Sequence, residues 1–120
     1  MSIKNTNPEI GGIFKIKIDS QTFYVMSKEK SVWVDNREIT FLSPISVVPG
    51  TLVLIIDFLL YHNAPVVKLL LLSKNSKEQK IIYWIPPSFK ILIKGIKTKM
   101  DFFKKDVFFA SWFLTFKQVV

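Results

Sequence analysis

The chain between residues 51 and 73 reads TLVLIIDFLLYHNAPVVKLLLLS. Two long aliphatic runs flank the short sequence HNAP, and such runs are typical of strands that are buried on both faces. Proline and asparagine between the runs are turn-forming residues. We therefore predict a central hairpin in which residues 51–61 and 66–73 are the strands and residues 62–65 are the turn.

Shorter segments on either side of this hairpin also show strand patterns. Residues 13–18 alternate apolar side chains with lysines, which is the period-2 pattern of a half-buried strand. Residues 22–26 follow after a short turn, so the sequence predicts that these two segments pair as a hairpin. The other predicted strands are residues 31–34, 38–42, 80–85 and 89–97.

The composition favours the same fold class. The 120 residues include 15 Ile, 11 Val and 6 Thr but only 2 Ala. Branching at Cβ favours strands, whereas alanine is the best helix former. Seven to nine short strands predict an all-β, mostly antiparallel barrel or sandwich, and OB-like and SH3-like barrels are similar in strand number alone. We expect a flexible arm over residues 1–12 and one domain over residues 13–120.

The last segment, residues 101–120, permits two interpretations. The high aromatic content favours a strand from about residue 107, and a C-terminal helix is the alternative. In the strand, one face would hold Phe108, Ala110, Trp112, Leu114 and Phe116. In the helix, a single polar stripe would hold Lys104, Ser111, Thr115 and Gln118.

Charge is distributed unevenly along the chain. There are 17 basic and 9 acidic residues, which give a formal net charge of +8. Residues 1–60 carry six of each sign, whereas residues 61–120 carry eleven basic and three acidic residues. The whole excess therefore lies in the second half, and it is densest between Lys90 and Lys105.

This basic region predicts a surface for nucleic acid or another polyanion. A bulge at Gly95 would bring the lysines on both sides of it onto one face of a strand. Lysines that follow a phosphate backbone, beside aromatic rings on which bases stack, are typical of single-strand binding. The predicted lysines are Lys90, Lys94, Lys97, Lys99, Lys104 and Lys105. The predicted aromatic residues are Tyr83, Trp84 and Phe89.

Simpler interpretations of the same residues stand beside this one. Lysines between apolar strand residues are commonly a solvated face, and they protect sheet edges from aggregation. Large aromatic residues such as Trp84 and Phe89 are more often part of a core. Sixteen of the basic residues are lysine and only Arg37 is arginine, so we expect backbone contacts with little sequence specificity.

Residue types that perform chemistry are scarce. The chain has no cysteine and one histidine, His62, which argues against thiolate chemistry and the usual zinc sites. Asp57 is the most unusual carboxylate because it lies within an apolar run. A shift of the central turn by one residue on each side would place Lys68 opposite Asp57, and we favour this pair, or an outward-facing Asp57, over catalysis. We expect no enzyme activity, cofactor or metal.

A second class of function uses the aromatic residues near the C-terminus. Residues 102–116 hold more rings than one small core readily encloses, and exposed apolar patches mark interfaces. The alternative function is therefore a structural or protein-interaction subunit, with a homo-oligomer or a larger assembly as its partner. The sequence shows neither a signal peptide nor a transmembrane helix, so we expect an intracellular protein without integral membrane association.

Overall fold

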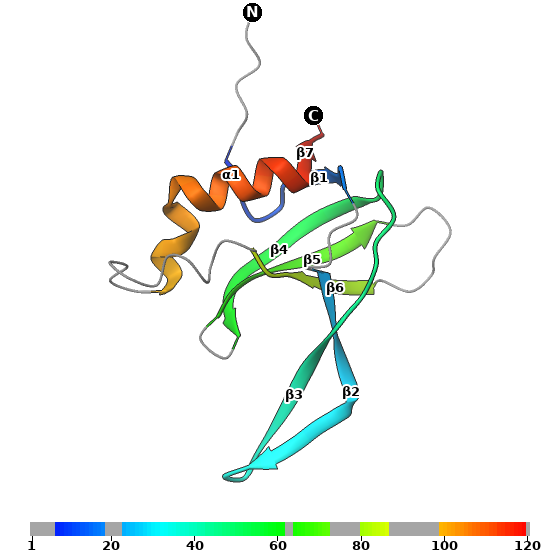
Figure 1. Ribbon diagram of the computed structural model, residues 1–120, viewed down its shortest axis with the longest axis vertical. Coiled ribbons are helices and arrows are strands. Elements are labelled where there is room, and N and C mark those ends of the chain that lie inside the picture. Colours follow the sequence, from blue (N-terminus) through cyan, green and yellow to red (C-terminus); the bar gives the residue numbers. More distant parts are fainter. Residues whose placement is uncertain (1–6, 19–22, 62–63, 73–79, 87–98, 120) are drawn as a thin grey trace, which may run out of the picture.

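The computed structural model describes residues 7–18, 23–61, 64–72, 80–86 and 99–119. Seven strands, one 3-10 helix (η2) and one α-helix follow one another along these residues (Figure 1). The strands are β1 (Ile13–Ile16), β2 (Phe23–Val34), β3 (Arg37–Pro44), β4 (Leu52–Tyr61), β5 (Ala64–Leu72), β6 (Lys80–Trp84) and β7 (Phe116–Gln118). The helices are η2 (Lys99–Lys104) and α1 (Asp106–Thr115).

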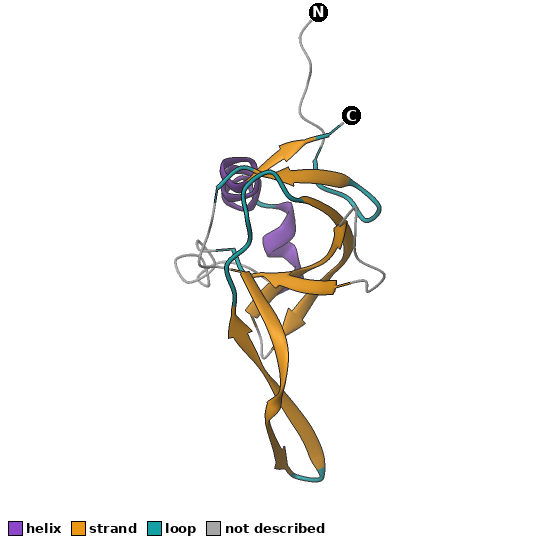
Figure 2. Cartoon of the chain, turned by 90° about the vertical axis from the view of Figure 1, so that its right-hand side faces the viewer, coloured by secondary structure: helices purple, strands orange, loops and turns teal. Residues whose placement is uncertain are grey.

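The strands form one antiparallel sheet in the order β3-β2-β6-β5-β4-β1-β7. The prediction of a mostly antiparallel β protein is therefore confirmed. The sheet curls strongly, as Figure 2 shows, but β3 and β7 are not paired and the sheet does not close into a barrel. Helix α1 lies across the open side of the curled sheet (Figure 1).

The central hairpin is present as β4 and β5, with the shifted turn. Tyr61 pairs with Ala64, two residues before the predicted start of the second strand, and Lys68 lies directly opposite Asp57 in the register. A bulge between Ile55 and Asp57 adds one residue to β4. Because side chains alternate along a strand, the extra residue turns Asp57 from the core face to the exposed face.

The predicted hairpin of residues 13–18 and 22–26 is wrong. Strand β1 pairs with β4 on one side and with β7 on the other, whereas β2 pairs with β3 and β6. Local turn signals favoured the nearest strand in sequence. The core instead requires Phe14 and Ile16 on the inner face beside β4, where both side chains are buried.

The preferred strand at the C-terminus is also wrong for residues 107–115, which belong to the alternative helix, α1. A strand would place Phe108, Ala110 and Trp112 on one face. The structure instead buries residues four apart, Phe108 and Trp112, and exposes Ala110 and Leu114. The aromatic residues that favoured a strand locally are therefore used by a helix that covers the core.

The helix does not present the predicted polar stripe to solvent. The Thr115 side chain is buried, and its hydroxyl donates a hydrogen bond to the Ser111 carbonyl at 3.1 Å. The exposed positions are Asp106, Ala110 and Leu114. This helix is apolar around most of its circumference, a pattern typical of helices that depend on tertiary packing.

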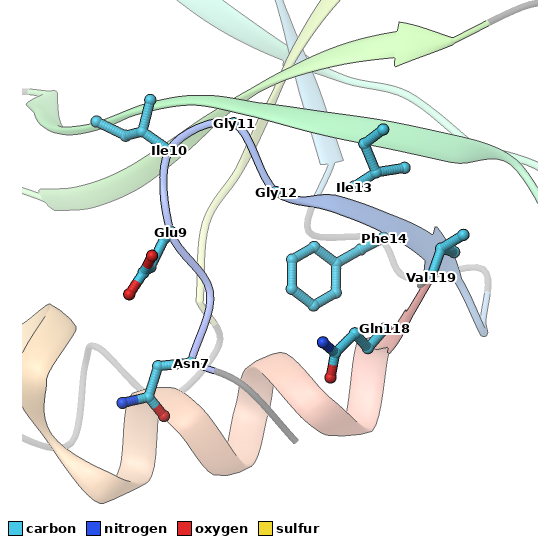
Figure 3. Close-up of a pocket in the computed structure, with 9 residues that line it drawn as sticks. All are labelled: Asn7, Glu9, Ile10, Gly11, Gly12, Ile13, Phe14, Gln118 and Val119. Carbon is cyan, nitrogen blue, oxygen red and sulfur yellow. The ribbon is translucent and has the colours of Figure 1, made fainter. Parts of the chain in front are cut away.

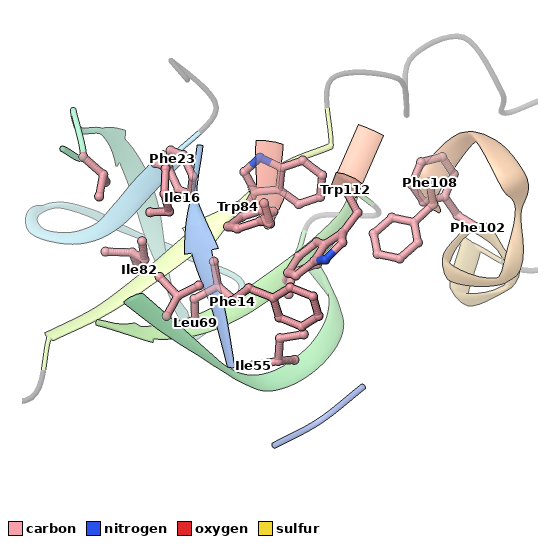
Figure 4. Close-up of a cluster of buried hydrophobic side chains, with 14 residues drawn as sticks. Phe14, Ile16, Phe23, Ile55, Leu69, Ile82, Trp84, Phe102, Phe108 and Trp112 are labelled. Carbon is pink, nitrogen blue, oxygen red and sulfur yellow. The ribbon is translucent and has the colours of Figure 1, made fainter. Parts of the chain in front are cut away.

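Aromatic side chains dominate the core between the sheet and α1 (Figure 4). Trp84 of β6 packs against Trp112 and Phe116, with ring centroids 5.4 and 5.3 Å apart and the rings almost perpendicular. Trp112 also packs edge-on against Phe14 of β1, at 5.0 Å. Such edge-to-face pairs add favourable energy beyond the burial of area.

Residues 11 and 12, at the end of the N-terminal segment that was predicted to be flexible, are hydrogen-bonded to the sheet. The Gly11 amide donates to the Ile55 carbonyl at 2.8 Å, and the Ile55 amide donates to the Gly12 carbonyl at 3.0 Å. Gly11 has a φ of +90°, which is a backbone conformation that favours glycine. Residues 1–6 lie outside the described residues.

Strands β2 and β3 form a long hairpin that extends away from the rest of the molecule (Figures 1 and 2). The turn of this hairpin lies at Asp35 and Asn36, whose φ angles are 49° and 63°. Two successive positive φ angles are typical of the two-residue turns that match strand twist. We call the residues of this hairpin beyond its pairing with β6, residues 25–44, the arm, and the remainder of the described chain the body.

Candidate nucleic-acid interface

The structure describes only part of the predicted basic surface. The predicted contacts that lie outside the described residues are Phe89, Lys90, Lys94 and Lys97. Lys99 is the first residue of the 3-10 helix η2 and therefore does not lie on a strand. Lys104 and Lys105 are exposed at the junction between η2 and α1.

The two predicted aromatic contacts that are described are buried. Trp84 is 0% exposed, and its Nε1 has no hydrogen-bond partner among the described residues. Tyr83 is 7% exposed, and burial, together with the neighbouring Tyr61, raises the pKa of its hydroxyl. Trp84 thus lies in the core, the alternative location considered for it, and its ring faces other side chains instead of solvent.

Lys104 and Lys105 precede the first turn of α1. Lys105 is the N-cap residue, with an extended backbone and no side-chain cap. The Lys105 carbonyl accepts hydrogen bonds from the amides of Phe108 and Phe109, at 3.0 and 3.3 Å. A helix N-terminus carries partial positive charge, and the two ammonium groups add to it, whereas the exposed carboxylate of Asp106 in the first turn offsets part of this potential.

A second group of lysines lies near the other end of α1. Lys15 of β1 and Lys117 of β7 are directly opposite in the antiparallel register, and both are exposed. Lys17 comes directly after β1 in the chain. Its Nζ donates a hydrogen bond to the Phe113 carbonyl at 3.0 Å, near the C-terminus of α1. Like charges placed directly opposite in a sheet destabilise it, so the Lys15–Lys117 pair is unfavourable without an anion.

Helix α1 therefore has exposed lysines at both ends. Its ten residues extend about 15 Å at about 1.5 Å per residue. Between the two groups, the exposed side chains of the helix include Ala110 and Leu114, and Leu114 is 69% exposed. We call Lys15, Lys17, Lys104, Lys105 and Lys117 the basic surface.

The sequence interpretation missed part of this surface. Lys15 and Lys17 were interpreted as the solvated face of a strand, and Lys117 was not considered. Their proximity depends on the pairing of β1 with β7, which joins residues about 100 positions apart. A count of local charge contains no signal for such a contact.

A shallow pocket of about 380 Å³ lies beside the basic surface, between residues 7–14 and the end of β7 (Figure 3). Its polar side chains are Asn7, Glu9 and Gln118, and Phe14 lines its inner wall. Glu9 is the single carboxylate in this lining. One carboxylate without a second acid, a histidine or a nucleophile beside it does not form a general acid–base pair.

Other chemistry-bearing residues of the described chain remain apart. Asp57 is exposed, and its Oδ1 accepts a hydrogen bond from the Phe58 amide at 2.8 Å, opposite Lys68 in the register. No cluster of three or more metal-ligating side chains occurs among the residues that the structure describes. Within the same residues, no helix has the length and apolar character needed to cross a membrane.

Comparisons with known proteins gave no relative for this chain. Neither the models of protein families, nor the curated proteins, nor the solved structures contain a match.

Proposed function

We propose that this protein is a non-enzymatic, intracellular binding module that contacts the phosphate backbone of single-stranded nucleic acid through its basic surface. The observation that carries this proposal is the Lys15–Lys117 pair. Two ammonium groups directly opposite in a sheet repel each other, and a phosphate between them converts that repulsion into two favourable contacts. The lysines at the N-terminus of α1 extend the same potential along the helix.

The expected binding has low sequence specificity. Lysine contacts phosphate as a point charge, whereas reading of guanine depends on the planar fork of arginine, and Arg37 is the single arginine of the chain. The described basic surface also lacks an exposed aromatic ring for stacking, because Trp84 is enclosed in the core. The proposal also includes three predicted phosphate contacts that precede η2 in the chain, namely Lys90, Lys94 and Lys97.

The test is a titration of labelled single-stranded DNA, RNA and duplex DNA at several salt concentrations. Backbone binding predicts that log affinity falls linearly with log salt, by about 0.7 per phosphate contacted on a single strand. The double variant Lys15→Gln with Lys117→Gln is expected to reduce this slope by about 0.7, since the one phosphate held between the two lysines is lost. Absence of binding at about 50 mM salt would sink the proposal.

A matched control is Lys80→Gln. Lys80 is exposed, lies on β6 and has the same charge, but it is not part of the basic surface. We expect the salt slope of this variant to equal that of the unaltered protein. An equal reduction by the control and by the double variant would mean that net charge, and not this surface, governs binding.

The alternative function, assembly through the aromatic C-terminal segment, receives less support. Phe102, Phe108, Trp112 and Phe116 are all buried in the core, so the excess of rings is enclosed within one chain. Leu114 is the one strongly exposed large apolar side chain of α1. If Leu114→Asp dissociated an assembly of this protein, that function would regain its support.

A further inference from the structure

The arm lacks the support that the other strands receive. Strand β2 pairs with β6 only at Phe23 and Tyr24, and beyond these residues it pairs with β3 alone. Strand β3 is the last strand of the sheet, so its outer edge has no partner strand in the described part of the chain. A two-stranded ribbon in water is marginally stable, and an unpaired edge accepts a further strand.

Large apolar side chains are exposed along this ribbon. Trp33 near the tip is 72% exposed, Met26 is 45% exposed and Phe41 is 42% exposed. The other two tryptophans of the chain, Trp84 and Trp112, are 0% exposed. Exposed tryptophan is strongly enriched among residues that dominate binding energy at interfaces, so the arm has the features of a docking element.

The base of the arm carries a feature that complements its tip. A shallow pocket of about 470 Å³ is lined by Tyr24, Pro44, Ile45 and Ser46, where β3 ends. If two β3 edges pair antiparallel about a two-fold axis at Phe41, Glu38 of each copy lies opposite Pro44 of the other, and Trp33, which pairs with Glu38, lies in the same row. This pairing carries the tip of each arm, with Trp33, to the base of the second arm.

The net charge of the arm also permits contact with the arm of a second copy of this chain. Its six charged residues comprise three basic and three acidic side chains, so its net charge is zero. Helix α1 and strands β1 and β7, which carry most of the basic surface, lie on the side of the molecule away from the tip of the arm (Figure 1). Two copies that meet through their arms therefore keep these surfaces apart, and salt screens charges beyond about 8 Å.

We infer that two copies of this chain form a symmetric dimer through their arms. The two β3 strands pair edge to edge and antiparallel, and each Trp33 packs at the pocket of Tyr24, Pro44, Ile45 and Ser46 on the other copy. A two-fold axis requires a self-complementary surface, and a neutral arm with a knob at its tip and a pocket at its base meets that requirement. This inference is independent of nucleic-acid binding.

Sedimentation equilibrium tests the dimer. We expect a concentration-dependent dimer for the unaltered chain and, for Trp33→Ala, a dissociation constant raised about 30-fold or more, which is the effect of removing a dominant interface residue. Trp33→Phe should retain most of the affinity. Leu114→Ala is the matched control, since Leu114 is equally exposed but lies on α1. A monomer at every concentration, or a dimer that loses affinity with Leu114→Ala and not with Trp33→Ala, would overturn the inference.

Tryptophan fluorescence gives a second readout in the same samples. Because Trp84 and Trp112 are buried, collisional quenching by iodide reports mainly on Trp33. Quenching should decrease as protein concentration rises, in parallel with the sedimenting dimer. A dimer in which Trp33 stays fully quenchable would contradict the proposed contact.

Cross-linking tests the antiparallel arrangement directly. The chain has no cysteine, so introduced thiols are the only ones present. A mixture of Ile39→Cys chains and Ser43→Cys chains should form a disulfide-linked dimer far faster than either variant alone, or than Arg37→Cys chains, because residues 39 and 43 lie directly opposite each other in the antiparallel arrangement. Fastest cross-linking of Arg37→Cys with itself would instead indicate tip-to-tip contact and exclude this arrangement.

Discussion

The two long hairpins of this protein, β4–β5 and β2–β3, have the same antiparallel pairing but different surroundings. The β4–β5 hairpin lies between β1 and β6, and its inner face packs under η2 and α1. The β2–β3 hairpin is held at one end by β6 and otherwise stands alone. The difference shows that backbone pairing defines a hairpin, whereas stability comes from the layers packed against it.

Two tryptophans give the strongest test of this comparison. Trp84→Ala should destabilise the body by about 3–5 kcal/mol, because it removes a large buried side chain and leaves a cavity. Trp33→Ala should change the stability of the monomer by less than about 0.5 kcal/mol, since the side chain is exposed. Denaturant unfolding at low protein concentration measures both. Similar losses for the two variants would mean that the arm is packed as tightly as the body.

A substitution at the turn of the arm should have a smaller effect on stability, and this effect should be confined to the β2–β3 hairpin. Asn36 has a φ of 63°, and glycine adopts this conformation without the Cβ penalty. Asn36→Gly should therefore stabilise the arm by up to about 1 kcal/mol. Hydrogen exchange should show slower exchange of arm amides and unchanged exchange in β4 and β5. Slower exchange in both hairpins would indicate that they unfold as one unit.

The comparison extends to the two outer strands of the sheet, neutral β3 and basic β7. Lys117→Glu places an acidic residue opposite Lys15, so the free energy of unfolding should rise by about 0.2–1 kcal/mol. Nucleic-acid affinity should fall in the same variant, because a phosphate contact becomes repulsive. Thermal unfolding and the salt titration measure the two effects. A stability gain without a loss of affinity would remove Lys117 from the basic surface.

The smallest expected effect concerns pH at the junction of body and arm. Burial raises the pKa of Tyr83 above its usual 10.0, with a further contribution from Tyr61. The folded form therefore holds its proton where the unfolded form has lost it. Stability is full below pH 10.0 and declines as the pH rises towards the folded-state pKa of Tyr83. Unfolding measured across this range, with Tyr83→Phe as the comparison, should show a shallower decline for the variant.

Sequence patterns predicted local structure better than distant contacts. The apolar runs on either side of residues 62–63 identified the central hairpin, because such runs and turn residues act over a few positions. The outward position of Asp57 depends on the bulge between Ile55 and Asp57, for which the sequence has no local signal. The pairing of β1 with β4 and β7 was missed, because nothing within residues 13–26 indicates which distant strand will lie beside Phe14.

The same contrast between local structure and distant contacts applies to the candidate site. Local charge density identified Lys104 and Lys105, which are exposed. Residue type alone could not distinguish the core role of Trp84 from a stacking role, since burial depends on α1 lying across the sheet. Helix α1 was itself ambiguous, because a nearly uniform apolar segment has neither strand nor helix periodicity.

The pairing of β1 with β7 also has a consequence for the order of folding. The Lys17 side chain reaches the Phe113 carbonyl across 96 positions of sequence, and the Lys17 amide donates to the Thr115 carbonyl at 2.8 Å. During synthesis, the outer edge of β1 therefore stays unpaired until β7, the strand that follows α1, has been made. Contacts of such long range are associated with slow folding. We expect chains that stop before residue 106 to leave the ring of Trp84 uncovered and to associate with chaperones.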